Sequence, residues 1–211
     1  MVNLLILNMK SKKYILIYIS MILIKIKKYY LKKEDKITKI KIIIDYQIKS
    51  FEFLFSNVDC IESIYFRRFK RININNMRCM FGKCSSLKKI DFSNFKTDNV
   101  EYMSYMFGKC SSLIEVNLSN INTQNVNSMS YMFEDCSSLK NVNISNVNNN
   151  GTKCDMIGMF QGCSSLKELN LSNFNTNNVT DIHSMFYGCS DEFKKKIKSE
   201  HKNIKPEAFY N

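Results

Sequence analysis

Copies of one short peptide recur along the sequence at an almost constant spacing. They read MFGKCSSL, MFGKCSSL, MFEDCSSL, MFQGCSSL and MFYGCS, and they begin at Met80, Met106, Met132, Met159 and Met185. The steps between them are 26, 26, 27 and 26 residues. A sustained period in this range predicts an array of stacked units, in which each unit completes its core against its neighbours. The one extra residue falls in 146–156, where asparagines and Gly151 indicate a loop.

A degenerate copy precedes these units. Leu54 and Phe55 replace the Met-Phe pair, and the later apolar positions are kept at Ile61, Ile64, Phe66, Phe69, Ile74 and Met77. The polar positions are lost, which is typical of a terminal unit. We therefore expect the repeat array to occupy residues 54–190, with about five 26-residue repeats.

Each unit has two halves with different apolar patterns. In SSLIEVNLSNI (111–121), the residues Leu113, Val116 and Leu118 leave polar neighbours on the opposite face, and this ending predicts a short strand. In NVEYMSYMFGKC (99–110), apolar residues recur at steps of three and four, which predicts a short helix. The same spacing at 48–55 predicts a helix before the first repeat.

These patterns resemble a known family. The frame Leu-x-x-Ile/Val/Leu-x-Leu/Ile/Phe resembles the leucine-rich repeat, and the unit MFxxCSSLxxVNLSNFNTxNVxxM is similar to the 26-residue repeat of BspA-like bacterial surface proteins, over roughly residues 48–190. The usual asparagine position differs, since it holds Phe95, Ile121, Val147 and Phe174. We expect the nearby asparagines to bond the loop backbone instead; these are Asn94, Asn120, Asn146 and Asn173.

The expected fold class is an α/β repeat solenoid. It is a leucine-rich-repeat-like, right-handed coil of short parallel strands and short helices, with an N-terminal strand cap and a C-terminal helix cap. The family resemblance implies an interaction surface. It supplies no ligand, catalytic residue or compartment.

The net charge of +12 is unevenly distributed along the chain. Residues 1–76 carry 16 basic and 6 acidic side chains, whereas residues 77–190 carry 9 of each. Only four residues are Arg, the residue type that reads phosphates and bases with a bidentate fork. The neutral array and the absence of a basic-aromatic module predict that no nucleic acid is bound.

The N-terminal segment, residues 1–35, combines lysines with an apolar run. Lys10, Lys12 and Lys13 precede the run 14–24, a pattern typical of a secretory signal. No small-residue cleavage site follows, and eleven residues of helix span only about 16 Å of a roughly 30 Å hydrocarbon core. The alternatives are an anchor, membrane contact through residues 1–33, a start at Met9 or Met21, or a buried cap. In that last interpretation, residues 36–46 form a strand covering the first repeat, within a cap at 36–53.

The cysteines form a column at Cys84, Cys110, Cys136, Cys163 and Cys189. Side chains of equivalent position point the same way, so we expect buried free thiols and not disulfides. Cys154, in the inserted loop, is the expected exposed thiol. The spacing required for a zinc site is missing, as is a paired nucleophile and base, so the sequence predicts no metal, no cofactor and no enzyme.

The outward residues of the predicted strands form the candidate binding face. The first two strands vary most, and Tyr65 and Arg67 are residue types enriched at binding hot spots. We predict that a protein partner contacts Tyr65, Arg67, Lys88 and Lys89. Glycosylation sequons open at Asn117, Asn143, Asn150, Asn170 and Asn178, and glycans would crowd this face if the chain entered a eukaryotic secretory pathway.

The end of the sequence, residues 191–211, predicts a capping helix. Ser190 is its N-cap, Phe193 and Ile197 cover the last repeat, and Pro206 ends it. Taken together, the sequence favours a non-enzymatic protein-binding module at the cell surface or outside the cell. The alternative is an intracellular scaffold or adaptor with no export.

Overall fold

The computed structural model describes residues 3–9, 13–19, 37–44, 49–59, 61–66, 73–93, 95–145, 153–172 and 178–210. Short strands dominate, and a helix appears only near the end of the described chain. The elements are β1 (Asn3–Met9), β2 (Lys13–Ile19), β3 (Ile37–Ile44), β4 (Ile61–Phe66), β5 (Lys89–Asp91), β6 (Glu115–Asn117), β7 (Asn141–Asn143), β8 (Cys154–Asp155), β9 (Glu168–Asn170), β10 (Val179–Asp181), α1 (Asp191–Glu200) and the 3₁₀ helix η1 (Pro206–Phe209).

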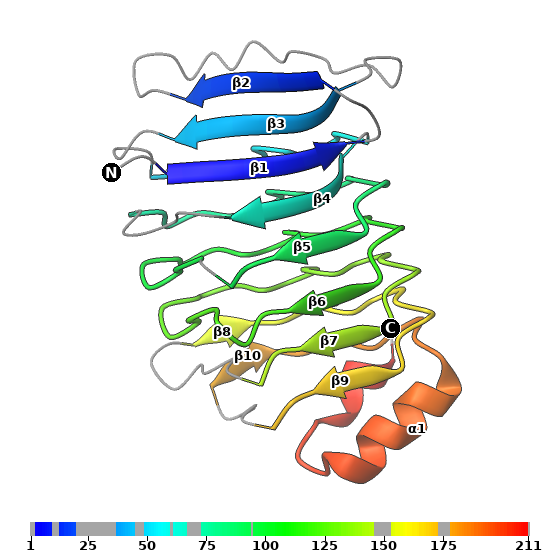
Figure 1. Cartoon of the computed structure of the whole chain (residues 1–211). Helices are drawn as coiled ribbons and strands as arrows, with labels where there is room; N and C mark the ends of the chain where they lie inside the picture. Colours follow the sequence, from blue (N-terminus) through cyan, green and yellow to red (C-terminus); the bar gives the residue numbers. More distant parts are fainter. Residues whose placement is uncertain are drawn as a thin grey trace.

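The strands of successive repeats lie side by side in sequence order, β4, β5, β6, β7 and β9 (Figure 1). The paired strands run parallel, and each residue faces its equivalent one period later, as Val116 faces Val142 and Val142 faces Leu169. Within β5, β6 and β9 the central side chain is buried and both of its neighbours are exposed. The predicted short parallel strands are therefore confirmed, in a β-rich architecture built from repeats.

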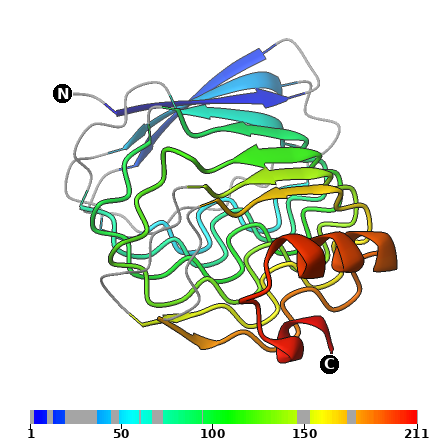
Figure 2. The same cartoon turned by 90° about the horizontal axis from the view of Figure 1, so that it is seen from below.

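A second parallel ladder runs along a different side of the units (Figure 2). It consists of single bridges joining Ser50, Asn76, Tyr102, Ser128 and Asp155, and it ends in the pair β8 and β10. Polar side chains on this ladder accept hydrogen bonds from the backbone two residues later, as Asn76 does from the N–H of Arg78 (2.9 Å). Such bonds begin the turn segments that follow Ser50, Asn76, Ser128, Asp155 and Asp181. Among the described residues of this ladder, Tyr102 has no side-chain acceptor bond of this kind.

The prediction of short helices in the repeats is wrong, because within 99–110 the structure has a bridge at Tyr102 and consecutive turns at 104–109. The N–H of Met103 donates to the carbonyl of Ser128 (2.9 Å), and the N–H of Tyr105 donates to that of Ser130 (3.0 Å). Between them, the N–H of Met106 bonds to Met103 three residues back (3.2 Å). An α-helix would use every N–H internally, at four residues back. Here alternate N–H groups bond to the next unit instead, and residues 51–59 form turns in the same way.

Two residues in each turn segment adopt the left-handed backbone region, four residues apart. In the third unit these are Tyr105 (φ 56°) and Lys109 (φ 65°), and in the fifth they are Gly158 (φ 55°) and Gly162 (φ 73°). A residue with positive φ breaks a right-handed helix every four positions, which explains the chain of turns. The glycine of MFGKCSSL is not one of them, since Lys83 (φ 63°) takes this conformation and not Gly82.

The core is organised by a column of stacked phenylalanines. Rings of Phe55, Phe81, Phe107, Phe133, Phe160 and Phe186 follow one another with centroid separations of 5.5, 5.4, 5.3, 5.4 and 5.9 Å. Their planes deviate by at most 12° from parallel. Each such pair contributes about 0.5–1.5 kcal/mol beyond the burial of its area. Identical side chains repeated along the stack therefore add to the cohesion that the backbone hydrogen bonds between units provide.

The predicted column of buried thiols is confirmed. Each thiol donates to the carbonyl of the phenylalanine in the preceding unit, as Cys136 does to Phe107 (3.1 Å). Burial raises the pKa of Cys136 well above its usual range and raises that of Cys189 to about 12, so these thiols stay protonated at neutral pH. The prediction for Cys154 is wrong: it is fully buried, because it lies in β8 and its side chain points into the core.

The N-terminal strands form a sheet with the first two repeats, in the order β2, β3, β1, β4, β5. The strand predicted at 36–46 is confirmed as β3, but it does not cover the first repeat. That place is taken by β1, which pairs antiparallel with both β4 and β3. Three apolar runs in this part of the chain are able to form strands, and their composition does not determine which one lies next to β4. No helix in the described ranges is long and apolar enough to cross a membrane.

The helix α1 covers the last repeat, as predicted (Figures 1 and 2). Ser190 caps it by accepting from the N–H of Phe193 (3.2 Å), and both Phe193 and Ile197 are buried. Phe193 and Phe209 both contact the ring of Phe186, which ends the phenylalanine column. Pro206 does not end α1, because the helix stops at Glu200 and Pro206 begins η1.

Two glycine substitutions test the role of the left-handed positions. We expect Gly162→Ala to lower the free energy of unfolding by about 1–2 kcal/mol, because an L-residue is strained there and its Cβ would run into Asp135. Gly82→Ala is the matched control. Its Cβ would lie 3.4 Å from the Cys79 carbonyl, an ordinary contact, and we expect a change below about 1 kcal/mol. Urea unfolding followed by circular dichroism measures both, and equal losses would contradict the assignment.

Candidate binding groove

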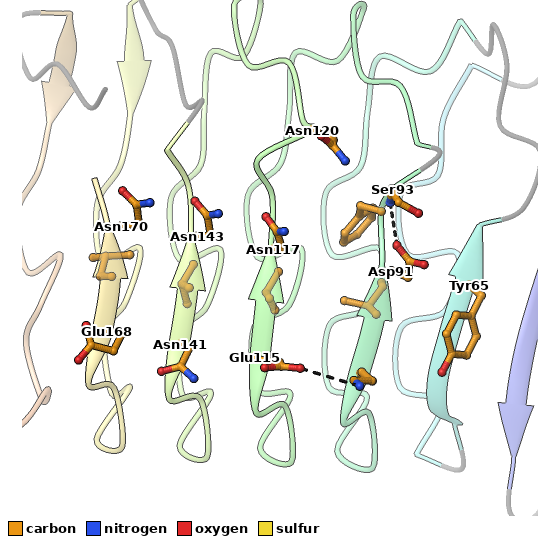
Figure 3. A pocket seen from close by; sticks show the side chains of 16 residues that line it. Tyr65, Asp91, Ser93, Glu115, Asn117, Asn120, Asn141, Asn143, Glu168 and Asn170 are labelled. Carbon is orange, nitrogen blue, oxygen red and sulfur yellow. Dashed lines mark hydrogen bonds and ion pairs between the residues drawn. The ribbon is translucent and has the colours of Figure 1, made fainter. Parts of the chain in front are cut away.

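A groove of about 590 Å³ runs across the outward faces of the repeat strands (Figure 3). It crosses β4, β5, β6, β7 and β9, so its lining repeats with the period of the chain. The polar side chains of the lining are Tyr65, Lys89, Asp91, Ser93, Glu115, Asn117, Asn120, Asn141, Asn143, Glu168 and Asn170. This is the face that the alternation of the strands predicts to point outward.

Two rows of side chains flank the buried central column of the strands. The first row, at the beginning of the strands, contains Lys89, Glu115, Asn141 and Glu168. The second row, at their ends, contains Tyr65, Asp91, Asn117, Asn143 and Asn170. Neighbouring members of a row belong to adjacent strands, about 4.8 Å apart.

The side chains of the second row are held by the backbone. The Oδ1 atoms of Asp91, Asn117, Asn143 and Asn170 accept hydrogen bonds from the N–H groups two residues later, at 2.8, 2.9, 3.1 and 3.1 Å. This bond is the Asx turn, and it ends each strand. It also orients four side chains in the same way along the groove.

Ion pairs within the chain neutralise most of the charge at the groove. Lys89 lies 3.9 Å from Glu115, and Lys196 of α1 lies 2.8 Å from Glu168. The hydrogen bond to Glu168 raises the pKa of Lys196. The lining itself contains one lysine and three carboxylates, so it is not the basic surface that the overall charge suggests.

The structure places the four predicted contact residues in different settings. Tyr65 and Lys89 both line the groove. Lys88 lies beside the groove, outside its lining, where its ammonium is 3.2 Å from Glu62. Arg67 lies outside the described residues. The role of all four in binding stays a prediction.

The sequence did not lead us to expect the Asx bonds or the ion pair between Lys196 and Glu168. The recurrence of Asp or Asn two residues before Ser93, Ser119, Ser145 and Ser172 is the signal that indicates an Asx turn. The bonding role expected for the asparagines of the following loop finds no support at Asn120, which is exposed and lines the groove. Asn94, Asn146 and Asn173 lie outside the described residues.

Three of the five sequon asparagines face the groove. Figure 3 shows Asn117, Asn143 and Asn170 side by side on adjacent strands. Glycans on these side chains would fill the groove, so glycosylation and ligand binding at this face exclude one another. Asn150 lies outside the described residues, and Asn178 does not line the groove.

A second surface contains aromatic side chains on the turn segments, of which Phe53 is exposed and Tyr105 and Tyr131 are half-buried. Tyr105 and Tyr131 stack at 4.9 Å, and the guanidinium of Arg78 lies 6.0 Å from the ring centre of Phe53. A Cβ at Gly158 would run into the Tyr131 ring, so glycine at this position leaves room for the stack. Among the described residues, no group of three or more His, Cys, Asp and Glu side chains is placed to hold a metal ion.

A protein-family model matches the repeat array. The family model described as "Mycoplasma protein of unknown function, DUF285" matches residues 49–155 and residues 117–206. These overlapping segments include the whole of the array. No curated protein and no solved structure matches the sequence significantly.

Substitutions at Asn143 test the Asx bond. We expect Asn143→Ala to lower the free energy of unfolding by about 1 kcal/mol, because the N–H of Ser145 loses its acceptor. Asn143→Asp keeps an acceptor, as Asp91 does naturally, and we expect it to stay closer to the unsubstituted protein. Chemical denaturation of both variants provides the measurement. A larger loss for Asp than for Ala would show that the bond does not stabilise the strand end.

Proposed function

The chain belongs to the family described as "Mycoplasma protein of unknown function, DUF285", and from that premise we propose that it is a non-enzymatic binding protein. Its repeats form a leucine-rich-repeat-like solenoid of the BspA-like type. The protein acts at the cell surface or outside the cell, where it binds a protein partner through the groove.

The observation that supports this proposal is the groove itself. Five neighbouring strands present outward rows of polar side chains above a continuous buried core. A rigid surface of this kind binds a partner without paying the entropy of ordering flexible loops. Array proteins frequently use the strand face of their repeats in this way.

The resemblance of the repeat unit to BspA-like surface proteins supports a role outside the cell. The basic and apolar segment at residues 1–33 has the composition of an export signal or an anchor. An intracellular scaffold would use the same array, and the processing of the N-terminus separates the two roles.

We expect the protein isolated from its native cells to begin between about Ile24 and Lys36, as removal of an export signal requires. Such removal would take β1 and β2 away from the sheet that they form in the full chain, so the mature protein would lack the strand that pairs with β4. Intact-mass measurement with N-terminal sequencing checks this. A start at Met1, Met9 or Met21 in a protein that fractionates with the cytosol would contradict export and support the scaffold.

Partner capture tests the binding face. We expect the combined substitution of Tyr65, Arg67, Lys88 and Lys89 by alanine to reduce the retention of extracellular proteins at least about tenfold, since truncation of a hot-spot side chain costs about 2 kcal/mol or more. The control variant replaces Tyr187, Lys153, Lys195 and Lys202, which lie outside the groove lining. Equal retention by the two variants would show that the four predicted residues do not contribute to the interface.

A further inference from the structure

The asparagines of the second row form a set of oriented hydrogen-bond donors. We call Asn117, Asn143 and Asn170 the amide row. Because each Oδ1 already accepts a backbone N–H, the Nδ2 group of each side chain remains to donate toward the groove. The donors repeat at the spacing of adjacent strands, about 4.8 Å. A ligand lying across the strands would meet equivalent donors at regular intervals.

The amide row is followed by an acceptor and an aromatic ring. Asp91 occupies the same position on β5, where its Oδ1 accepts the N–H of Ser93 and its second oxygen can accept from a ligand. Tyr65 occupies it on β4, at one end of the groove. The row therefore presents three carboxamide donors, the carboxylate of Asp91 and the ring of Tyr65 on successive strands, as Figure 3 shows.

The charges at the groove do not favour an ionic ligand. Lys89 is paired with Glu115, Glu168 with Lys196, and Lys88 beside the groove with Glu62. An anionic ligand would have to displace a carboxylate from its lysine and would also lie near the other carboxylates of the lining. A cationic ligand would have to displace Lys89 or Lys196 from its carboxylate. A neutral ligand avoids both costs.

The groove lining has few of the side chains that dominate the centre of a protein interface, so a protein partner would be bound here mainly through polar contacts, including those to its glycans. Such centres are enriched in Tyr, Trp, Phe, Met and Arg and depleted in Lys, Glu, Asp and Ser. The lining contains several of the depleted types, three carboxylates among them, and its one aromatic ring that is not buried is the half-buried Tyr65. Its specificity must therefore come from many hydrogen bonds to both donors and acceptors.

From these observations we infer that the groove binds a neutral oligosaccharide chain lying across the strands. Sugar hydroxyls donate and accept, so they satisfy the amide row and Asp91 together, and the apolar face of one sugar ring packs on Tyr65. This inference rests on the proposed function only in taking the groove as the binding face. The sugar is either free or carried by a glycoprotein partner.

The test uses the full-length protein and soluble neutral hexasaccharides of glucose, mannose and N-acetylglucosamine in titration calorimetry. The groove variant combines Asn117→Asp and Asn143→Asp, which keep the Asx acceptors and remove two donor groups. The control variant combines Asn99→Asp and Asn127→Asp, which add the same charge outside the groove lining. Circular dichroism confirms that each variant is folded.

We expect at least one hexasaccharide to bind the unsubstituted protein and the control equally, and to bind the groove variant at least about tenfold more weakly, since two hydrogen bonds of roughly 1 kcal/mol each are lost. Equal affinity of the groove and control variants would overturn the inference. So would failure of all the hexasaccharides to bind, or saturable binding of oligolysine to the groove in their place.

The outcome is separable from that of the proposed function. Partner capture that survives enzymatic removal of glycans, and that is lost in the Tyr65, Arg67, Lys88 and Lys89 variant, supports a protein partner whether or not a hexasaccharide binds. Hexasaccharide binding with no protein capture supports the groove ligand alone.

Discussion

The hydrogen bonds between equivalent backbone positions of neighbouring units are the constraint on which this structure depends. They bring residues one period apart into contact, as Tyr102 with Ser128 and Val116 with Val142. Each side chain of a repeat consequently lies in a column with the side chains at the same position of the other units. The stacked phenylalanines and the buried thiols follow from this arrangement, because a residue type that packs well in one unit meets its own copy in the next.

The same columns create the groove. Strand alternation buries Val116 and Val142 and exposes their polar neighbours, and stacking turns those neighbours into rows. The Asx bonds then orient the second row before any ligand arrives, which lowers the entropy lost on binding. A structural bond that ends a strand thus also prepares a surface for recognition.

The net charge of the chain does not predict the charge at the groove. The chain carries a net charge of +12, yet residues 77–190 are neutral and the groove lining contains more carboxylates than lysines. The residues Lys88 and Lys89, predicted to contact a partner, each have a carboxylate nearby. A partner that engaged these lysines would have to replace existing ion pairs, whereas a neutral ligand would leave them intact.

The sequence by itself determined the period, the in-and-out alternation of the strands, the buried cysteine column and the capping by Ser190, Phe193 and Ile197. These features depend on residue spacing within one unit. Only the tertiary structure decided that the turn segments are not helices, that β1 and not β3 lies beside β4, and that Cys154 is buried. It also decided that Lys196 reaches Glu168. Apolar steps of three and four suit both a helix and a chain of turns, and the choice depends on hydrogen bonds to a unit about 26 residues away, which local spacing does not contain.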